Sequence, residues 1–213
     1  MKDVKGMLKF SQTVAVVASL GVVLMGCQTT KPVVSTAPTA SAINDTSYAF
    51  TSPAEGKVVA GDWTLNNDGT ILQSSVTNRF PLLVFNAPVF KDLDYTADFK
   101  IESGIEDQYA ALTFRIVDDR NYYAVRASAS EQSVTFARFD DGSRSVLKTW
   151  AATVKQGDWQ TLSVSMRGAD VVIVLNGVEV GRIADEHFGS GKVGLGTKAD
   201  SITRFRKVMA VAM

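Results

Sequence analysis

Residues 161–196 read TLSVSMRGADVVIVLNGVEVGRIADEHFGSGKVGLG. Apolar and polar side chains alternate strictly over residues 161–167, which is the period of a strand with one buried face. Farther on, Asn176-Gly177 separates two runs rich in β-branched residues. A type I′ turn needs positive φ at both central residues, so Asn-Gly between such runs predicts a β-hairpin. This stretch therefore indicates an antiparallel sheet.

The same signals continue from Tyr48 onward, with a strand and a turn every ~8–12 residues and no long helical pattern. The strands that we expect beside the hairpin cover residues 46–50, 63–65, 71–73, 79–85, 94–101, 110–117, 122–127, 133–139, 146–150, 159–167, 192–197 and 205–211. Strands in such number usually cover their apolar faces by packing as two sheets. We predict an all-β domain over residues 46–213, an antiparallel β-sandwich of jelly-roll type.

The first 26 residues have the features of an export signal. Three Lys precede an apolar stretch at residues 13–25 that is short for a transmembrane helix. It ends in Leu24-Met25-Gly26-Cys27, which resembles the lipobox of bacterial lipoproteins. That resemblance implies cleavage before Cys27 and lipidation of its thiol and new amino group; an ordinary secretory peptide is the alternative.

The residues after the signal predict a tether and a destination. Residues 27–45 are rich in Thr, Ser, Ala and Pro and have no face to bury, so we expect a flexible tether. Gln28 stands where an Asp would resemble the inner-membrane retention signal. The resemblance therefore implies the outer membrane, on its periplasmic face.

The charge balance argues against nucleic acid as a partner. The chain has 22 basic and 22 acidic residues, and removal of three Lys and one Asp with residues 1–26 leaves 19 and 21. A formal charge of −2 gives no basic footprint. Cys27 is the only cysteine, so no disulfide is available to the domain. The expected membrane partner is reached through the lipid on Cys27.

Several segments, in order, resemble the concanavalin A-like lectin/glucanase superfamily, and most closely its laminin G-like bacterial domains grouped with the 3-keto-disaccharide hydrolase family. They are ALTFR at 111–115, DDRNYYAVR at 118–126, GDWQTL at 157–162, the Asn-Gly hairpin, and GKVGLGTKADS at 191–201. The resemblance covers about residue 90 to the C-terminus. It implies the sandwich fold, which serves lectins, glycosidases and adhesion modules alike.

The sequence departs from the glycosidases of that superfamily. Laminarinase-type members carry paired carboxylates as E-x-D-x-E on one strand, and period 2 places those acids on one face. No such run occurs here. Retaining glycosidase chemistry of that kind is therefore not expected.

Polar and aromatic residues of two consecutive strands are the main candidates for a ligand site. If the strands pair, Arg115 and Arg126 project side by side, together with either Tyr122 or Tyr123. Guanidinium groups donate hydrogen bonds to sugar hydroxyls, and an aromatic ring stacks on sugar C–H groups. The alternative is that both arginines pair with acids such as Asp98 or Glu102 on a solvated face.

Three further residues are candidates. Lys198 and Asp200 follow a predicted strand and would lie at a sheet rim, where they either grip a ligand or form a surface ion pair. His187 is the only histidine and stands outside any catalytic pattern, so a loop role is favoured.

No cofactor is expected. Calcium has weak support, because Asp92 and Asp94, and separately residues 66–69, offer oxygen ligands without a complete loop motif. No zinc, haem or nucleotide motif is present.

Three functions remain open from the sequence. The favoured one is a lipid-anchored periplasmic module that binds a glycan on the concave face of its sandwich. The second is a sugar-active hydrolase or lyase, in which Asp98, Glu102 or His187 would assist the same polar residues. The third is a cell-envelope interaction module without a small ligand.

Overall fold

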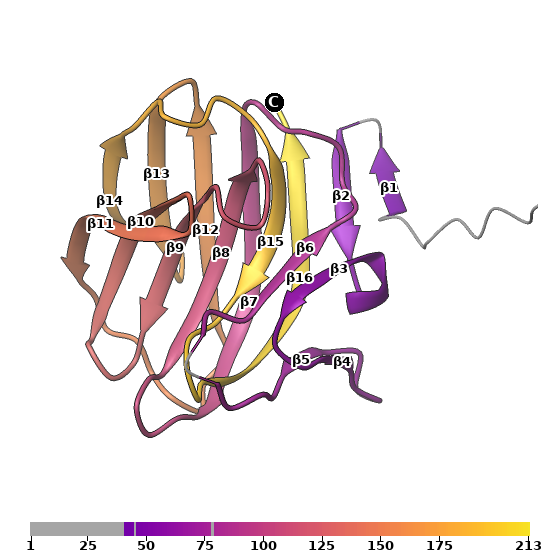
Figure 1. Ribbon diagram of the computed structural model, residues 1–213, viewed down its shortest axis with the longest axis vertical. Helices are drawn as coiled ribbons and strands as arrows, with labels where there is room; N and C mark the ends of the chain where they lie inside the picture. The colour runs from indigo at the N-terminus through magenta and orange to yellow at the C-terminus, as the bar shows by residue number, and fades with distance from the viewer. Residues whose placement is uncertain (1–40, 45, 78) are drawn as a thin grey trace, which may run out of the picture. The chain divides into compact units, whose positions relative to one another are not determined.

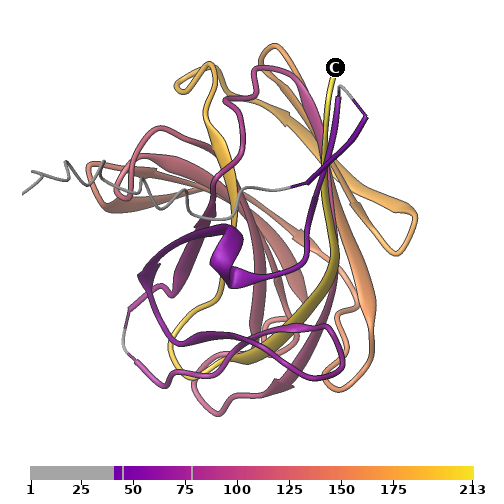
Figure 2. The same ribbon diagram turned by 90° about the vertical axis from the view of Figure 1, so that its right-hand side faces the viewer.

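The computed structural model describes residues 41–44, 46–77 and 79–213. Its strands form two antiparallel sheets that face each other as layers (Figures 1 and 2). Among the described residues the only helical element is the 3₁₀ turn η1, Pro53–Glu55. The predicted all-β sandwich is confirmed.

Nine strands form the first sheet. In spatial order they are β1 (Ser41–Asn44), β2 (Ser47–Phe50), β16 (Ile202–Ala212), β7 (Leu93–Ser103), β12 (Gln160–Arg167), β13 (Asp170–Leu175) and β14 (Val178–Ala184), with β5 (Ile71–Gln73) on β16 and β4 (Trp63–Leu65) on β5. The β13–β14 turn has Asn176 at φ 52° and Gly177 at φ 80°. The hairpin predicted there is confirmed.

Seven strands form the second sheet. In spatial order they are β11 (Ser143–Ala151), β10 (Ser133–Asp140), β9 (Tyr122–Ser128), β8 (Tyr109–Ile116), β15 (Lys192–Gly196), β6 (Leu82–Phe85) and β3 (Gly56–Ala60). Strands β8 to β11 follow one another as hairpins, whereas β15 inserts between β8 and β6 from far along the chain (Figure 1).

The main core lies between the sheets. Leu162, Val164 and Met166 of β12 are almost fully buried, as their alternation predicts. From the opposite sheet, Phe114 of β8 and Phe136 of β10 stack with their ring centroids 6.2 Å apart. Burying apolar area of this kind is the dominant source of stability in such a domain.

The sheets also meet at one edge. Trp150 of β11 packs directly on Gly181 of β14, where a Cβ would lie 2.2 Å from the indole Nε1. The glycine thus leaves room for the indole, and the two edge strands contact each other across the sandwich.

The N-terminal part of the chain differs in detail from the expectation. Strand β1 lies within the segment expected as a tether, and β3 is a strand that the sequence pattern does not predict. The strand expected over 79–85 is shorter, because β6 begins only after Pro81, which has no N–H to donate. The signal and Cys27 lie outside the described residues. In the described part no helix is long and apolar enough to cross a bilayer.

Candidate functional site

A second apolar cluster lies on the outer face of the seven-stranded sheet, the face turned away from the main core. It consists of Leu82, Ile116, Tyr122, Ala124 and Phe139, with Phe80 packed against them. An antiparallel sheet usually exposes a polar face to water. Burial of both faces of β8 and β9 therefore marks this surface as unusual.

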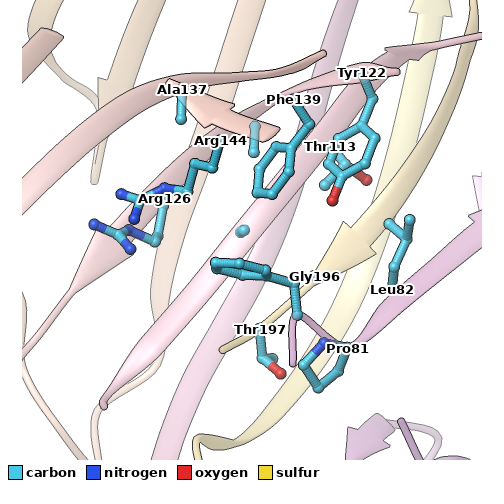
Figure 3. A pocket seen from close by; sticks show the side chains of 13 residues that line it. Pro81, Leu82, Thr113, Tyr122, Arg126, Ala137, Phe139, Arg144, Gly196 and Thr197 are labelled. Atoms are coloured by element: carbon cyan, nitrogen blue, oxygen red, sulfur yellow. The ribbon is translucent and has the colours of Figure 1, made fainter. Parts of the chain in front are cut away.

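Small residues hollow out this face. Strand register places Gly196 of β15 opposite Ala111 of β8, and Thr113 of β8 opposite Ala124 of β9. Ala137 of β10 lies opposite Ala124 in turn. Because none of these residues carries a long side chain, they form the floor of a pocket of about 390 Å³, the solvent at its open mouth included (Figure 3).

Aromatic rings form one side of the pocket. Tyr122 stacks on Phe139 with ring centroids 4.4 Å apart, and Phe80 meets Phe139 edge to face at 5.1 Å. Phe80 comes from the segment before β6 and stays partly exposed. A sugar ring can place its C–H groups on such surfaces.

Arg126 provides the polar end of the pocket. Only 8% of its surface is exposed, and its Cζ lies 4.0 Å from the centroid of the Tyr109 ring. Nη2 lies 3.4 Å from Glu131, whereas Nε and Nη1 have no hydrogen-bond partner in the described structure. These two buried donors therefore lack a partner within the protein.

Arg144 of β11 reaches the same end of the pocket (Figure 3). Its Cζ lies 5.9 Å from the centroid of the Phe80 ring. Burial lowers the pKa of Arg126, and the positive charge of Arg144 lowers it further. The two guanidinium groups are therefore close enough to repel each other.

The structure separates the two candidate tyrosines. Tyr122 lines the pocket, and Tyr123 points into the main core. There the Tyr123 hydroxyl donates to Asp185 and accepts a hydrogen bond from the Phe188 N–H at 3.1 Å. Burial and the Asp185 carboxylate raise the pKa of Tyr123 to about 12. Of this pair, Tyr122 is the residue that a ligand in the pocket would meet.

The expected placement of Arg115 beside Arg126 is wrong. Arg115 has a φ of 46°, and β8 has one residue more than β15 at this point, which is a β-bulge. The bulge turns the side chain inward, where Nη1 donates to the Phe188 carbonyl at 2.8 Å and Nη2 to the Lys91 carbonyl at 3.0 Å. Arg115 thus holds loops together at the end of the sandwich.

Lys198 and Asp200 lie outside the pocket and have protein partners. Lys198 pairs with Asp107 at 2.9 Å. Asp200 accepts hydrogen bonds from the backbone N–H groups of Ile105 at 2.6 Å and Asp107 at 3.0 Å, and these bonds lower its pKa. Its carboxylate therefore holds this loop at neutral pH and releases it only as the pH falls through that lowered pKa.

The acids considered for catalysis lie elsewhere. Asp98 and Glu102 belong to the nine-stranded sheet, where they pair with Arg206 at 3.2 Å and Arg204 at 2.8 Å. They do not pair with Arg115 or Arg126. Arg126 pairs instead with Glu131 at 3.4 Å, and Arg115 Nη2 lies 3.9 Å from Asp92. The alternative is therefore right that both arginines have an acid partner, but wrong about which acids these are and about a solvated face, since both arginines are buried. His187 lies in the segment after β14, and its Nε2 is 3.2 Å from the carboxylate of Asp140 at the end of β10.

The carboxylates considered for calcium have protein partners too. Asp92 accepts from the Gly168 N–H at 2.7 Å and Asp94 from the Ser165 hydroxyl at 2.6 Å, while Asp68 binds Thr70. No group of three or more His, Cys, Asp or Glu side chains that could hold a metal occurs in the part of the chain described.

Sequence reasoning missed several residues of the pocket. The sequence pattern predicts Phe80 to lie within a strand. The neighbouring Pro81 indicates instead that the strand starts only after it, which leaves Phe80 outside the sheet. Phe139 lies on a predicted strand and Arg144 just before another, but only the pairing of β9 with β10 and of β10 with β11 brings them beside Tyr122. The run of small residues at alternate positions of β8 to β10 was the available signal.

A family model for the 3-keto-alpha-glucoside-1,2-lyase-like domain matches residues 44–210. The chain belongs to this family. The match begins well before residue 90, where the resemblance read from the sequence starts. It includes every residue that lines the pocket of this 3-keto-alpha-glucoside-1,2-lyase-like domain.

Solved structures share the fold of this lyase-like domain. The carbohydrate binding module CBM66 from Bacillus subtilis is 24% identical, with a TM-score of 0.68 over 74% of this chain and 96% of that one. A Bacillus subtilis protein of unknown function with a galectin-like fold is 14% identical, with a TM-score of 0.58 over 75% of this chain and 91% of the other.

A GH43 protein from Bacillus licheniformis also matches, at 12% identity and a TM-score of 0.57, over 75% of this chain and 37% of its own. At these identities the likenesses show the fold alone. A comparison with curated proteins gave no match.

Proposed function

We propose that this protein is a carbohydrate-binding module, held by a lipid on Cys27 at the periplasmic face of the outer membrane, that binds a glycan in the pocket on its seven-stranded sheet. The observation that carries the proposal is the combination of Phe80 and Tyr122 with the unpaired guanidinium atoms of Arg126 in one hollow. Aromatic rings and directional donors are the two elements of sugar recognition.

The comparisons support this proposal at the level of the fold. The similar structure with a TM-score of 0.68 is named a carbohydrate binding module, and the match covers 96% of that module. The family name concerns an α-glucoside. Fold does not determine function, so the residues of the pocket must carry the argument.

The test is binding of the purified full-length protein to a glycan array, with Phe80→Ala and Arg126→Ala as variants. We expect each variant to weaken binding to the positive glycans by about tenfold or more, because stacking and charged hydrogen bonds are lost. Arg182→Ala, an exposed arginine on β14, is the matched control and retains binding. Circular dichroism checks that each variant is folded.

Two outcomes would contradict the proposal. If the protein binds no glycan, the proposed function is wrong. If wild type and Phe80→Ala bind equally well, the glycan does not bind in this pocket. Phe80 is partly exposed and lies outside the main core, so a Phe80→Ala variant that keeps the wild-type circular dichroism spectrum but loses binding has lost a ligand contact and not its fold.

A lyase is the second candidate, because the family description names one. The residues of the pocket fit binding better than proton transfer. Burial raises the pKa of the Tyr122 phenol, which makes it a poor base near neutral pH. The candidate base His187 pairs with Asp140, and neither residue lines the pocket. Incubation with a 3-keto-α-glucoside separates the two functions: turnover that Phe80→Ala abolishes would favour the lyase.

A further inference from the structure

The positive charge of the pocket exceeds the negative charge around it. Among the described residues, Glu131 is the acid that pairs with Arg126, and their closest atoms are 3.4 Å apart. Asp107 pairs with Lys198. Arg144 pairs with no acid in the described structure. A surplus of positive charge therefore remains at the end of the pocket where both guanidinium groups lie.

This arrangement is unfavourable for the protein by itself. Arg126 Nε and Nη1 are buried without hydrogen-bond partners, which costs free energy that only a partner can recover. The nearby charge of Arg144 adds repulsion in surroundings partly removed from water. An anion between the two groups would relieve both costs at once.

The surroundings limit the kind of anion. Beside the guanidinium groups lie the Phe80 ring and the stacked rings of Tyr122 and Phe139, with a floor of Ala and Gly residues. Such a surface accommodates the C–H groups of a sugar ring. A small inorganic anion would leave these rings uncovered, so the anion is expected to belong to a larger ligand.

We propose that the pocket is specific for a sugar that carries a carboxylate, as a uronic acid residue does; this rests on the proposed glycan binding. The planar guanidinium groups of Arg126 and Arg144 donate hydrogen bonds to the two carboxylate oxygens. Phe80 packs on the ring of the same sugar. Arg144 is only half-buried and extends from an edge strand, so its side chain can turn toward the carboxylate.

The test compares acidic sugars with neutral copies of the same shape. Binding of the full-length protein to trisaccharides of galacturonate, glucuronate and mannuronate is measured by calorimetry, each beside its methyl ester, with inorganic phosphate as a further arm. We expect at least one uronate to bind about tenfold or more tightly than its ester, because esterification removes the charge. The preference should shrink to about twofold in Arg144→Gln, since one of the two charged donors is lost.

Lys148→Gln is the matched control, because Lys148 is an exposed cation on the same strand and does not line the pocket. It should keep the full preference. Equal affinity for uronate and ester would overturn the inference and leave glycan binding standing. Phosphate binding as tight as that of the uronate would also overturn it, in favour of a plain anion site. If neither these sugars nor any glycan of the array binds, the proposed function falls as well.

Discussion

At the scale of single residues, Arg115 and Arg126 show how far a pattern can predict a site. Both arginines lie on predicted strands, and simple alternation puts both on one face. The positive φ of Arg115 reverses its direction, and Arg126 alone reaches the pocket. The residues of the segment ALTFR give no signal for the β-bulge, so the direction of the Arg115 side chain could not be predicted. The direction of Arg126 follows from simple alternation and could be predicted.

The inward direction of Arg115 predicts a structural role. We expect Arg115→Met to lower the free energy of unfolding by about 2–4 kcal/mol, since the carbonyls of Lys91 and Phe188 lose charged donors in a buried place. Urea denaturation followed by tryptophan fluorescence measures this change. Binding by the folded variant should stay as in the wild type. If the variant is as stable as the wild type but no longer binds glycan, Arg115 contacts the ligand and this prediction is wrong.

At the scale of elements, β15 fits between β8 and β6 because of its glycines. At Gly194 a Cβ would lie 2.3 Å from the Leu83 carbonyl oxygen, too close for any side chain. At Gly196 the nearest atoms to such a Cβ are 3.4 Å away, which is ordinary contact. The same strand therefore has one glycine that the packing requires and one that keeps the pocket open.

This difference gives a paired prediction. Gly194→Ala should lower the free energy of unfolding by about 1–3 kcal/mol, because the strand must shift away from Leu83. Gly196→Ala should unfold like the wild type but bind glycan several-fold more weakly, since its methyl group enters the pocket. Thermal unfolding and array binding measure the two effects. If both variants are destabilised equally, the contact distances at Gly194 and Gly196 do not determine the effect of an added methyl group on stability.

At the scale of the whole molecule, the class of fold could be predicted but the strand order could not. Alternation and turns such as Asn176-Gly177 are local, so the sandwich could be recognised. The position of β15 between β8 and β6 depends on contacts distant in sequence. The pocket needs that order, because Phe80, Arg126 and Gly196 come from separate regions of the chain.

The membrane anchor is a prediction at this scale as well. Cys27→Ser should leave the protein without a lipid and with residues 1–26 uncleaved, because the lipobox that directs both steps is lost, whereas the wild-type protein should carry the lipid on an N-terminal Cys27. Fractionation of cells, with mass spectrometry of the N-terminal peptide, measures this. Gln28→Asp is the companion variant, and it should keep the lipid while moving the protein to the inner membrane. A wild-type N-terminal peptide without a lipid on Cys27 would refute the anchor.

The β10–β11 hairpin carries Arg144 on an edge strand whose side chains are mostly exposed, whereas the pocket floor belongs to strands buried on both faces. Its tight turn at Asp141-Gly142 and the contact of Trp150 with Gly181 fix the backbone independently of the residue at position 144. We therefore expect that relatives with another residue at position 144 keep this scaffold while preferring other ligands.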